Sequence, residues 1–491
     1  MAVRIHNSLT KKKEEFAPLD PPKVKLYSCG VTVYDDCHIG HARSLYIFEV
    51  IRRYLQFRGF DVRFVRNITD IDDKIINRAN ELTVDWKELV AKYIGRYYED
   101  LQSLGLEKAD IEPRATENIP DMIKHIGVLI EKGFAYQTAT GVYFSVRKFK
   151  EYGRLSGQGI EQMLTGVRKD ADETKEDPLD FALWKTSKPA EPFWPSPWGN
   201  GRPGWHIECS VMSAKYLKSE TLDIHAGGRD LIFPHHENEI AQAEALTGKP
   251  FARYWIHHGL LTIDGQKMSK SLGNFVTIKD FLAKHHYADV LKLFFLSTHY
   301  SHPIDYTDDK IKEAKQALDR VINFNEEITR RLSGHQSKTK QATIKEIEEI
   351  KNNFIEAMDD DFNTPRGLAS IFDLVSCANK NIEKLDFIYN AQTTIKELLG
   401  IFGISLMKIV YVGVKNLDAS VNVIQPDIII KNKDGSAIVI EVKFIEAKIA
   451  ERNEAREHAR YNLADEIRRE LEEKGIILKD TKDGTTWRRK L

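Results

Sequence analysis

The sequence predicts an α/β protein built around a parallel sheet, and three changes of pattern along the chain support this fold class. From Lys23 to about Thr116, short runs of β-type residues alternate with longer runs at helical spacing, which is typical of parallel strands joined by crossover helices. The alternation returns with TLDIHAGGRDLIF and continues to WIHHGLLTI. Beyond Asp308 the chain is highly charged and has apolar residues at helical spacing. We therefore predict a parallel-sheet domain with an insertion, then an α-helical bundle and a small α/β C-terminal domain.

A chain of 491 residues is too long for a single hydrophobic core. The predicted segments are the first half of the α/β domain (1–116), an insertion (117–200), the second half (201–307), a helical bundle (308–409) and a small mixed α/β domain (410–491). In the last segment, Lys433-Asp434-Gly435 predicts a hairpin turn, and one long charged helix is expected from about Ile445 to Lys474.

Composition excludes several classes of protein. No run approaches the eighteen or so apolar residues of a membrane span, so we expect no membrane partner. The start of the chain lacks the apolar centre of a signal peptide, and its four cysteines are scattered, so a cytoplasmic protein with reduced thiols is expected. The net charge of −1 gives no global argument for nucleic acid, and any such binding would come from local patches.

The first candidate site is the tetrapeptide His38-Ile39-Gly40-His41, which follows a predicted strand and begins a predicted helix that runs to about Phe57. A helix N-terminus after a strand and a turn binds anions, because its free amides and its dipole point outward. His38 and His41 lie on one face and can donate hydrogen bonds to phosphate oxygens, and Gly40 lets a flat base approach the backbone. In isolation the tetrapeptide is equally typical of a solvated or packed histidine pair.

The second candidate is the run Lys267-Met268-Ser269-Lys270-Ser271, flanked by Gly265 and Gly273. Glycines permit a mobile loop, and lysine ammonium groups neutralise phosphates as charge develops on them. Taken alone, the run also describes an ordinary exposed basic turn. In this order, at either end of an interrupted α/β domain, the two motifs resemble the HIGH and KMSKS signature pair of class I aminoacyl-tRNA synthetases.

Four further residues have the chemistry of metal ligands. His235 and Glu239 are four apart in a predicted helix, so one face presents an imidazole and a carboxylate. Cys29 ends the first strand, and Cys209 stands in GWHIECSVM. Two thiolates, one imidazole and one carboxylate suit zinc. Isolated cysteines are more often ordinary buried thiols, and spacing alone does not bring four distant residues together.

A resemblance to a known family relates these residues to one another. It rests on the sequence stretches YSCGVTVYDDCHIGHAR, RNITDIDDKII, GRLSGQ, DPLDFALWK, DIHAGGRDLIFPHHENEIAQ, AMDDDFNTP and YNLADEIRRELEEKGIILKDT. Together they resemble the cysteinyl-tRNA synthetases over nearly the whole chain. The resemblance implies a class I synthetase catalytic domain of the Rossmann type. It also implies activation of L-cysteine with ATP to cysteinyl-adenylate and transfer to the 3′-terminal ribose of tRNA(Cys), in this class to the 2′-hydroxyl.

The resemblance also implies roles for particular residues. Cys29, Cys209, His235 and Glu239 are expected to bind one zinc ion, which also takes the substrate thiolate. His38, Gly40 and His41 would lie against ATP, and Lys267 and Lys270 would stabilise the departing pyrophosphate, with Mg²⁺ assisting. Because zinc separates a thiolate from an alcohol, cysteine is distinguished from serine without an editing domain. Cys37 and Cys377 match no ligand and are expected to be structural.

Further residues are expected to form the substrate pocket. Gly227 and Gly228 permit close backbone approach, and Asp230 is expected to bind the ribose hydroxyls or the substrate ammonium, or else to cap the next helix. Thr69 and Trp205 are expected to wall the cysteine pocket, although a tryptophan is more often a core residue. His206 and His225 remain ambiguous between the pocket and the core, and His236 is expected to pack in the core or to support a metal ligand from behind.

The C-terminal part carries the tRNA expectations. The bundle resembles one that lies along the tRNA stem, and Trp487, with Arg488, Arg489 and Lys490, resembles an anticodon reader. The segment from about Val410 to Lys443 departs from the family pattern and is expected to extend the small domain's sheet. One alternative is a cysteine-activating ligase with a small amine acceptor, as in the mycothiol pathway, which lacks the final domain. Another is a catalytically dead zinc or RNA-binding adaptor.

Overall fold

A computed structural model describes residues 2–159, 163, 174–269, 273–333, 344–406, 427–431, 437–458, 460–473, 476–481 and 484–489. The chain folds as two compact units. One unit consists of Met1–Phe281 with Ala288–Met407, and the other of Leu282–Tyr287 with Lys408–Leu491. The predicted active-site residues belong to the first unit.

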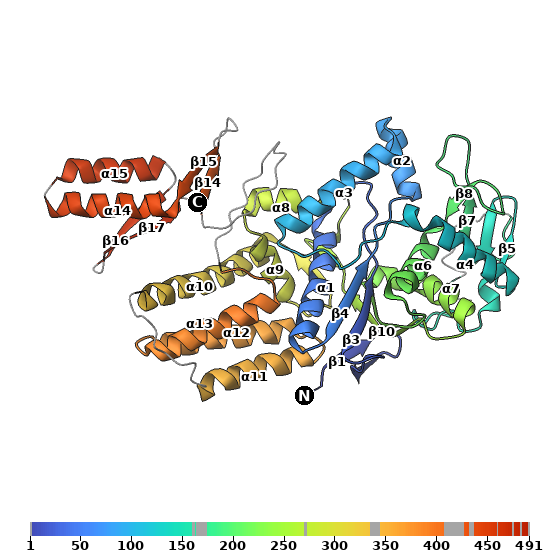
Figure 1. The fold of residues 1–491 in the computed structure, drawn as a ribbon, viewed down its shortest axis with the longest axis horizontal. Coiled ribbons are helices and arrows are strands. Elements are labelled where there is room, and N and C mark those ends of the chain that lie inside the picture. The colour runs from blue at the N-terminus through green and yellow to red at the C-terminus, as the bar shows by residue number, and fades with distance from the viewer. Residues whose placement is uncertain are drawn as a thin grey trace. The chain divides into compact units, whose positions relative to one another are not determined.

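The centre of the first unit is a four-stranded parallel sheet of order β10-β9-β3-β4. Its strands are β3 (Lys23–Ser28), β4 (Asp61–Arg66), β9 (Leu222–Gly228) and β10 (Ala252–His258). Helix α1 (Ile39–Phe57) connects β3 to β4 and packs on one side of the sheet, while α6 (Trp205–Leu217) packs on the other (Figure 1). The predicted α/β fold with parallel strands and crossover helices is confirmed.

Both faces of this sheet are buried, which explains the apolar strand sequences. Val24 and Leu26 of β3, Phe64 of β4 and Ile224 of β9 have no exposed surface. Among the described residues, this part of the chain also forms the α-helices α2 (Asp73–Leu82), α3 (Trp86–Ser103), α4 (Ile119–Glu131), α7 (Glu237–Thr247), α8 (Ile278–His285) and α9 (Ala288–Leu296).

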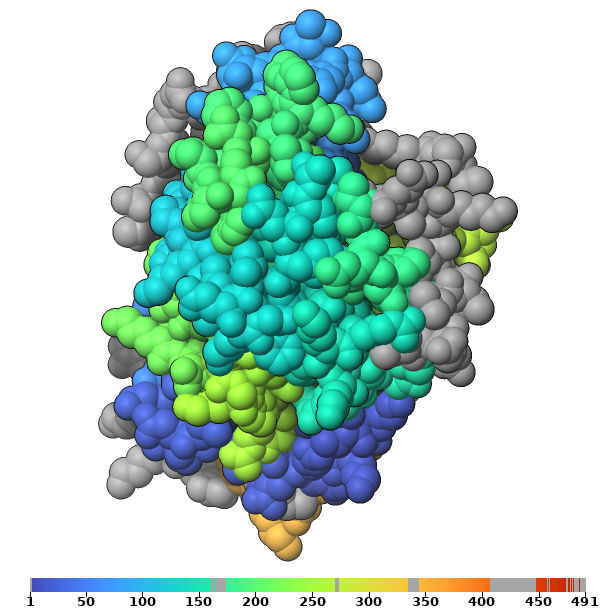
Figure 2. Space-filling view, turned by 90° about the vertical axis from the view of Figure 1, so that its right-hand side faces the viewer, coloured from blue at the N-terminus to red at the C-terminus, as the bar shows by residue number. Residues whose placement is uncertain are grey.

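A second sheet is antiparallel, and its strands come between β4 and β9 in the sequence. Its strands are β5 (Ala135–Gln137), β6 (Gly141–Phe144), β7 (Phe181–Thr186) and β8 (Gly201–Pro203), paired in that order. Val142, Phe144 and Trp184 are fully buried, in one cluster with Met122 and Leu129 of α4. In Figure 2 the teal and green segments that carry this sheet cover the face toward the viewer.

Two short sheets complete the strands of the first unit. The hairpin of β1 (Arg4–Asn7) and β2 (Lys12–Glu15) is antiparallel. Strand β11 (Leu261–Ile263) pairs antiparallel with β12 (Gln266–Lys267) and parallel with β13 (Ile304–Tyr306). The KMSKS sequence begins in β12, so this second sheet is the base from which the KMSKS loop extends.

The predicted helical bundle comprises α10 (Asp308–Leu332), α11 (Lys345–Asp359), α12 (Thr364–Lys380) and α13 (Leu385–Ile401), drawn yellow to orange in Figure 1. The apolar faces of these amphipathic helices meet in a core that includes Leu318, Phe354, Ile371 and Ile395. Tyr54 of α1 donates a hydrogen bond to Asp359 Oδ1 (2.7 Å), which attaches the bundle to the helix that begins with the HIGH motif.

The described residues beyond 426, all in the second unit, form two helices and two hairpins. Strands β14 (Asp427–Lys431) and β15 (Ala437–Glu441) pair antiparallel, as do β16 (Ile476–Thr481) and β17 (Gly484–Arg489). The hairpin predicted around Lys433-Asp434-Gly435 therefore forms, although the turn itself lies outside the described residues. Within the described residues the two hairpins form separate sheets, so the expectation that 410–443 extends the small domain's sheet is wrong for β14 and β15.

The single long helix predicted from about Ile445 to Lys474 is also wrong. The structure has two helices there, α14 (Val442–Glu457) and α15 (Tyr461–Glu473), packed against each other. Ile467 and Leu471 of α15 pack with Ile476 and Leu478 of β16, and Ile449 of α14 adds to this cluster. One continuous helix would leave this apolar face in water, so the fold divides the helix to bury it.

Within the described parts of the chain, none of the helices combines the length and the apolar character that crossing a bilayer requires.

Candidate active site

The predicted metal ligands converge below the carboxyl edge of the parallel sheet. Cys29 directly follows β3, Cys209 lies on α6, His235 lies in the π-helix Ile232–His236 that leads into α7, and Glu239 lies on α7. The helix predicted from His235 is thus π-helical in its first two residues and α-helical from Glu237, and His235 and Glu239 face each other. All four side chains are buried.

The distances within this group match a tetrahedral donor set. The two sulfurs are 3.6 Å apart, Cys29 Sγ is 3.5 Å from Glu239 Oε1, and Cys209 Sγ is 3.7 Å from His235 Nε2. Zinc bonds of about 2.3 Å to sulfur and about 2.0 Å to nitrogen in a tetrahedron require edges of about 3.8 Å between sulfurs and about 3.5 Å from sulfur to nitrogen. His235 Nε2 and Glu239 Oε1, at 2.9 Å, form a hydrogen bond and would have to separate slightly. The four residues therefore fit a zinc ion.

The electrostatics of the group also favour a cation. Burial and the adjacent Cys209 sulfur raise the pKa of Cys29 well above that of an ordinary thiol. Burial opposes ionisation of Cys209 as well, but hydrogen bonds with Cys29 and His235 lower its pKa to about 6. Two thiolates 3.6 Å apart in a buried site repel each other unless a positive charge lies between them. A divalent cation would let both sulfurs ionise.

Three further histidines surround this group: His206 and His225, which the sequence left ambiguous, and His236, which was expected to pack or to support a ligand. His225 Nε2 is 2.7 Å from Glu239 Oε2, the carboxylate oxygen that does not face His235. His206 Nδ1 is 2.8 Å from His235 Nδ1, and His236 Nε2 is 3.2 Å from Cys29 Sγ. His225 and His236 also form a second donor group with Cys29 and Glu239. We favour the first group, because it supplies two thiols and because His225 already holds Glu239.

Trp205 packs against the metal group, and Thr69 is linked to it through Asn67, whose Oδ1 lies 3.7 Å from Cys209 Sγ. The Trp205 ring stacks on His235 with centroids 4.0 Å apart. Thr69 is buried and donates a hydrogen bond to Glu208 Oε2 (2.7 Å). Glu208, which sequence reasoning missed, is fully buried next to Cys209, and burial raises the pKa of its carboxyl well above the usual range. An acidic residue beside a cysteine in an otherwise apolar helix face was the signal that could have identified it.

The HIGH residues form the N-terminus of α1. The rings of His38 and His41 are stacked, with centroids 3.7 Å apart. His38 Nδ1 accepts a hydrogen bond from His41 N, and His41 Nδ1 accepts one from His38 N. A neutral imidazole that accepts at Nδ1 carries its proton on Nε2, and burial with the nearby His38 lowers the pKa of His41 well below its usual value. Both rings therefore present an Nε2–H donor.

Gly40 has a packing role in addition to the approach of a base that the sequence predicts, which stays a prediction. A Cβ at this position would lie 2.9 Å from His38 Cε1 and Nδ1. A side chain there would displace the His38 ring from its stack, so Gly40 preserves the arrangement of the two imidazoles.

The KMSKS loop lies against this helix terminus. The Met268 methyl group would be 3.4 Å from a Cβ at Gly40, and Phe275 packs edge-on against His38 with centroids 5.3 Å apart. Lys267 is exposed at the end of β12. Lys270 lies outside the described residues. The HIGH motif and the described part of KMSKS are thus neighbours in space, although more than half of the residues of the first unit lie between them in the sequence.

Gly227 and Gly228 end β9, close to the metal group. A Cβ at Gly227 would lie 2.6 Å from His236 Cε1, and one at Gly228 would lie 2.3 Å from Asp230 Oδ1. Asp230 is exposed and its carboxylate lies over Gly228, where a ligand at the sheet edge can reach it. Cys37 and Cys377 are buried thiols that belong to neither donor group.

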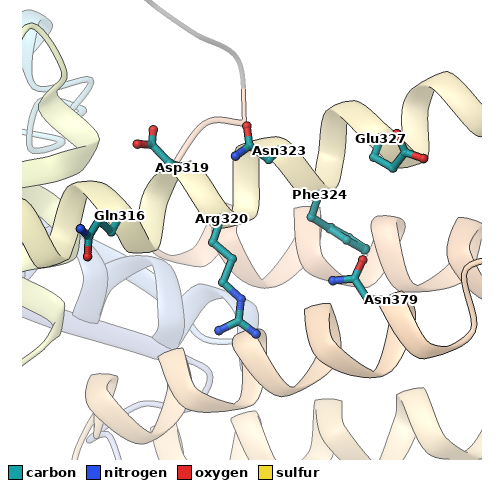
Figure 3. A pocket seen from close by; sticks show the side chains of 7 residues that line it. All are labelled: Gln316, Asp319, Arg320, Asn323, Phe324, Glu327 and Asn379. Atoms are coloured by element: carbon teal, nitrogen blue, oxygen red, sulfur yellow. The ribbon is translucent and has the colours of Figure 1, made fainter. Parts of the chain in front are cut away.

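A groove of about 540 Å³ lies elsewhere, on the helical bundle. Figure 3 shows its lining side chains, Gln316, Asp319, Arg320, Asn323, Phe324, Glu327 and Asn379, on α10 and α12. None of them is a predicted site residue. Because two carboxylates accompany the single arginine, the groove does not form a basic surface for RNA.

Comparisons with known proteins agree along the whole chain. Residues 15–316 match the family described as tRNA synthetases class I (C) catalytic domain, residues 353–407 match the DALR domain, and residues 445–488 match the cysteinyl-tRNA ligase anticodon binding domain. The chain is 49% identical to the cysteine–tRNA ligase of Thermodesulfovibrio yellowstonii over 508 residues, covering all of both proteins. It is 47% identical to that of Aquifex aeolicus over 497 residues, covering 100% of this chain and 99% of the relative.

Two solved structures share the fold at low identity. Methionyl-tRNA synthetase of Mycobacterium tuberculosis, in complex with methionyl-adenylate, has a TM-score of 0.59 at 15% identity and covers 77% of this chain and 90% of its own. The ternary complex of Agrobacterium radiobacter K84 agnB2 LeuRS, tRNA and LeuAMS has a TM-score of 0.60 at 11% identity, covering 79% and 84%.

Proposed function

Because the chain belongs to the cysteine–tRNA ligases, a family of class I aminoacyl-tRNA synthetases, we propose specific roles for its residues in activating cysteine and transferring it to tRNA. The protein is an ATP-using cysteine–tRNA ligase whose partners are cysteine, ATP and tRNA. A ligase with a small amine acceptor is not supported, since residues 445–488 match an anticodon binding domain. The intact HIGH and KMSKS motifs argue against an inactive adaptor.

The observation that carries the proposal is the buried quartet of two thiols, an imidazole and a carboxylate at tetrahedral spacing. We assign Cys29, Cys209, His235 and Glu239 as the ligands of one zinc ion. When bound, zinc supplies a Lewis acid that takes the sulfur of cysteine as thiolate and takes the hydroxyl of serine poorly. Trp205 and Thr69 would wall the side chain of the bound amino acid.

In the first step the cysteine carboxylate attacks the α-phosphorus of ATP, and the bond to pyrophosphate breaks. The Nε2–H groups of His38 and His41 would donate hydrogen bonds to phosphate oxygens at the N-terminus of α1. Lys267 and Lys270 would stabilise the negative charge that accumulates on the leaving pyrophosphate, with Mg²⁺ as a further counter-charge. No protein nucleophile is needed, because positioning and charge stabilisation carry this chemistry.

The exposed carboxylate of Asp230 would bind either the ammonium of cysteine or the ribose hydroxyls of ATP, and the lack of a side chain at Gly228 leaves room for this carboxylate at the sheet edge. In the second step the 2′-hydroxyl of the terminal tRNA ribose attacks the carbonyl carbon of the adenylate, and AMP leaves. We assign tRNA stem contacts to the bundle of 308–409 and anticodon contacts to 410–491. The cytoplasm is the expected location.

The experiment is pyrophosphate exchange into ATP with cysteine or serine, before and after zinc chelation, with charging of tRNA on the same preparation. Exchange that requires cysteine and is lost with zinc, together with tRNA charging, is expected. Exchange that survives complete removal of zinc would contradict the metal assignment. Removing residues beyond 407 should spare adenylate formation and reduce transfer to tRNA, and undiminished transfer would contradict the anticodon assignment.

A further inference from the structure

The segment that follows the KMSKS loop is joined to the N-terminal end of helix α1 by backbone hydrogen bonds. Ile39 N donates to Val276 O (3.1 Å), and Ile278 N donates to Cys37 O (2.9 Å). These bonds join the start of α1, where the HIGH histidines lie, to the segment that leaves the loop. The end of the loop is thus fixed relative to His38 by the main chain itself.

The other end of the loop is attached to the same helix by one side chain, that of Arg43. Nη1 donates to the carbonyl oxygens of Gly259 (2.7 Å) and Leu260 (2.8 Å). Nη2 donates to those of Tyr300 (3.2 Å) and His302 (2.6 Å). All four N–H groups on the two terminal nitrogens of the guanidinium are therefore directed at main-chain oxygens.

These four carbonyls lie where two strands begin. Gly259 and Leu260 connect β10 to β11, and residues 300–302 lead into β13, which pairs with β11. Gly259 N also donates to Tyr300 O (2.8 Å), and a Cβ at Gly259 would lie 2.1 Å from His302 O. The two segments are thus in direct contact. Strand β11 is followed by its hairpin partner β12, which ends at Lys267. The guanidinium holds the base of the KMSKS hairpin.

An arginine suits this position better than any other residue. Its side chain has no exposed surface, and the described residues place no carboxylate within ion-pair distance of it. Burial lowers the pKa of its guanidinium to about 10, so the group stays positively charged at neutral pH. A planar fork of fixed donors can satisfy four diverging carbonyls at once, whereas a lysine ammonium has three donors at one point.

We propose that Arg43 is a positioning residue that fixes the KMSKS hairpin against the HIGH helix, and so sets the distance between the two phosphate-binding motifs. The inference rests on the proposed function, since it assumes that His38, His41 and the KMSKS lysines act on one ATP. Arg43 lies two residues after His41, so any movement of the hairpin base relative to its guanidinium changes the separation of the two motifs. Arg43 hydrogen-bonds to none of the four assigned metal ligands and to none of the predicted substrate-binding residues. It acts through main-chain carbonyls.

The test compares Arg43→Met with Arg52→Met in pyrophosphate exchange. Arg52 is a matched control, because it lies on the same helix, is 8% exposed, and hydrogen-bonds Lys108 O and Asp110, away from the KMSKS hairpin. We expect Arg43→Met to lower kcat about 100-fold, since small misplacements of reacting groups have effects of this size. The KM for cysteine and the zinc content should stay unchanged. Arg52→Met should lower thermal stability with kcat within about threefold of wild type.

Two further measurements distinguish a loss of hairpin positioning from a loss of folding. Arg43→Lys should fold and give an intermediate loss of about tenfold, because three donors replace four. Hydrogen exchange in Arg43→Met should be faster at the amides of Gly259 and Ile304, whose acceptors are Tyr300 O and Leu260 O, and unchanged in Arg52→Met.

Wild-type kcat in Arg43→Lys or Arg43→Met, or equal losses in the Arg43 and Arg52 variants at equal folded fraction, would overturn the inference alone. A wild-type protein with no cysteine-dependent exchange would overturn the proposed function, and with it this inference.

Discussion

Replacing His225 with phenylalanine should weaken zinc binding without touching a ligand. His225 Nε2 lies 2.7 Å from Glu239 Oε2, and both side chains are fully buried. The His225 ring also stacks on Trp255, with centroids 4.4 Å apart and planes inclined by 14°. His225→Phe keeps the ring and its stacking but removes the hydrogen-bond donor, so the variant isolates the contact with the carboxylate.

The size of the effect follows from the burial of this hydrogen bond. A hydrogen bond to a charged group contributes about 1.5 to 3 kcal/mol, and losing it leaves Glu239 Oε2 buried without a donor. That range corresponds to a fall in zinc affinity of about tenfold to a hundredfold, the usual cost of removing a group that orients a metal ligand. Because zinc is assigned to bind the substrate sulfur, the KM for cysteine should rise when zinc is limiting, and excess zinc should restore it.

The assay is zinc transfer to a chromophoric chelator of known affinity, followed by pyrophosphate exchange at several zinc concentrations. His125→Phe on α4 is the control, because His125 is only partly exposed and contacts Gln242 instead of a metal ligand. The control should bind zinc as wild type does. Zinc affinity of His225→Phe within about twofold of wild type would refute the argument that His225 holds Glu239 in place.

Three other changes have definite expected outcomes. Cys209→Ala should abolish both bound zinc, measured by elemental analysis, and cysteine-dependent exchange; a variant that loses zinc and keeps exchange would contradict the selectivity argument. Gly40→Ala should lower kcat at least tenfold at unchanged KM for cysteine, because the new Cβ would come within 2.9 Å of His38; an unchanged kcat would show that the ring stack is dispensable. Hydrogen bonds from Arg452 hold the pKa of Asp480 below its usual value, so this pair should stabilise the second unit above the unfolded pKa of about 3.9 and lose that effect as pH falls below it. Acid unfolding followed by circular dichroism should show this dependence weakened in Arg452→Gln, and an identical acid transition in the variant would contradict it.

The start of α1 was predictable because its determinants are local. A strand, a short turn and two histidines at the first helical turn lie within one short run of sequence, and the structure begins the helix at Ile39. The same local reasoning did not identify the role of Gly40, since the clash it avoids depends on the rotamer of His38. Local signals therefore located the motif and left its internal packing undetermined.

The metal group was not predictable from spacing, because its members come from different elements. Cys29 and Cys209 are 180 positions apart, and only the order of the strands brings β3 next to the helix that carries Cys209. The resemblance to a known family joined them. His225 was left ambiguous, since nothing in a strand sequence tells which buried histidine faces a carboxylate.

The long helix predicted in the second unit failed for a different reason. Charged residues and apolar residues at helical spacing continue on both sides of residues 458–460, so periodicity alone gives no break. The break exists because Ile467 and Leu471 are buried only when α15 turns back onto α14 and packs against β16. The boundary between α14 and α15 is therefore set by tertiary burial, which the helical pattern of the sequence does not reveal.

Arg43 shows the same limit at the active site. In the sequence it is one more charged residue on a helix, where a solvated side chain is the usual case. Its carbonyl acceptors come from segments before β11 and before β13, far along the chain. Parallel strands place their carboxyl ends at one edge of the sheet, so the residues that follow β3 and β10 meet there however distant they are in sequence. The HIGH histidines and Arg43 follow β3, while Gly259 follows β10, so the Arg43 guanidinium between these segments is able to link the helix that begins with the HIGH motif to the base of the KMSKS hairpin.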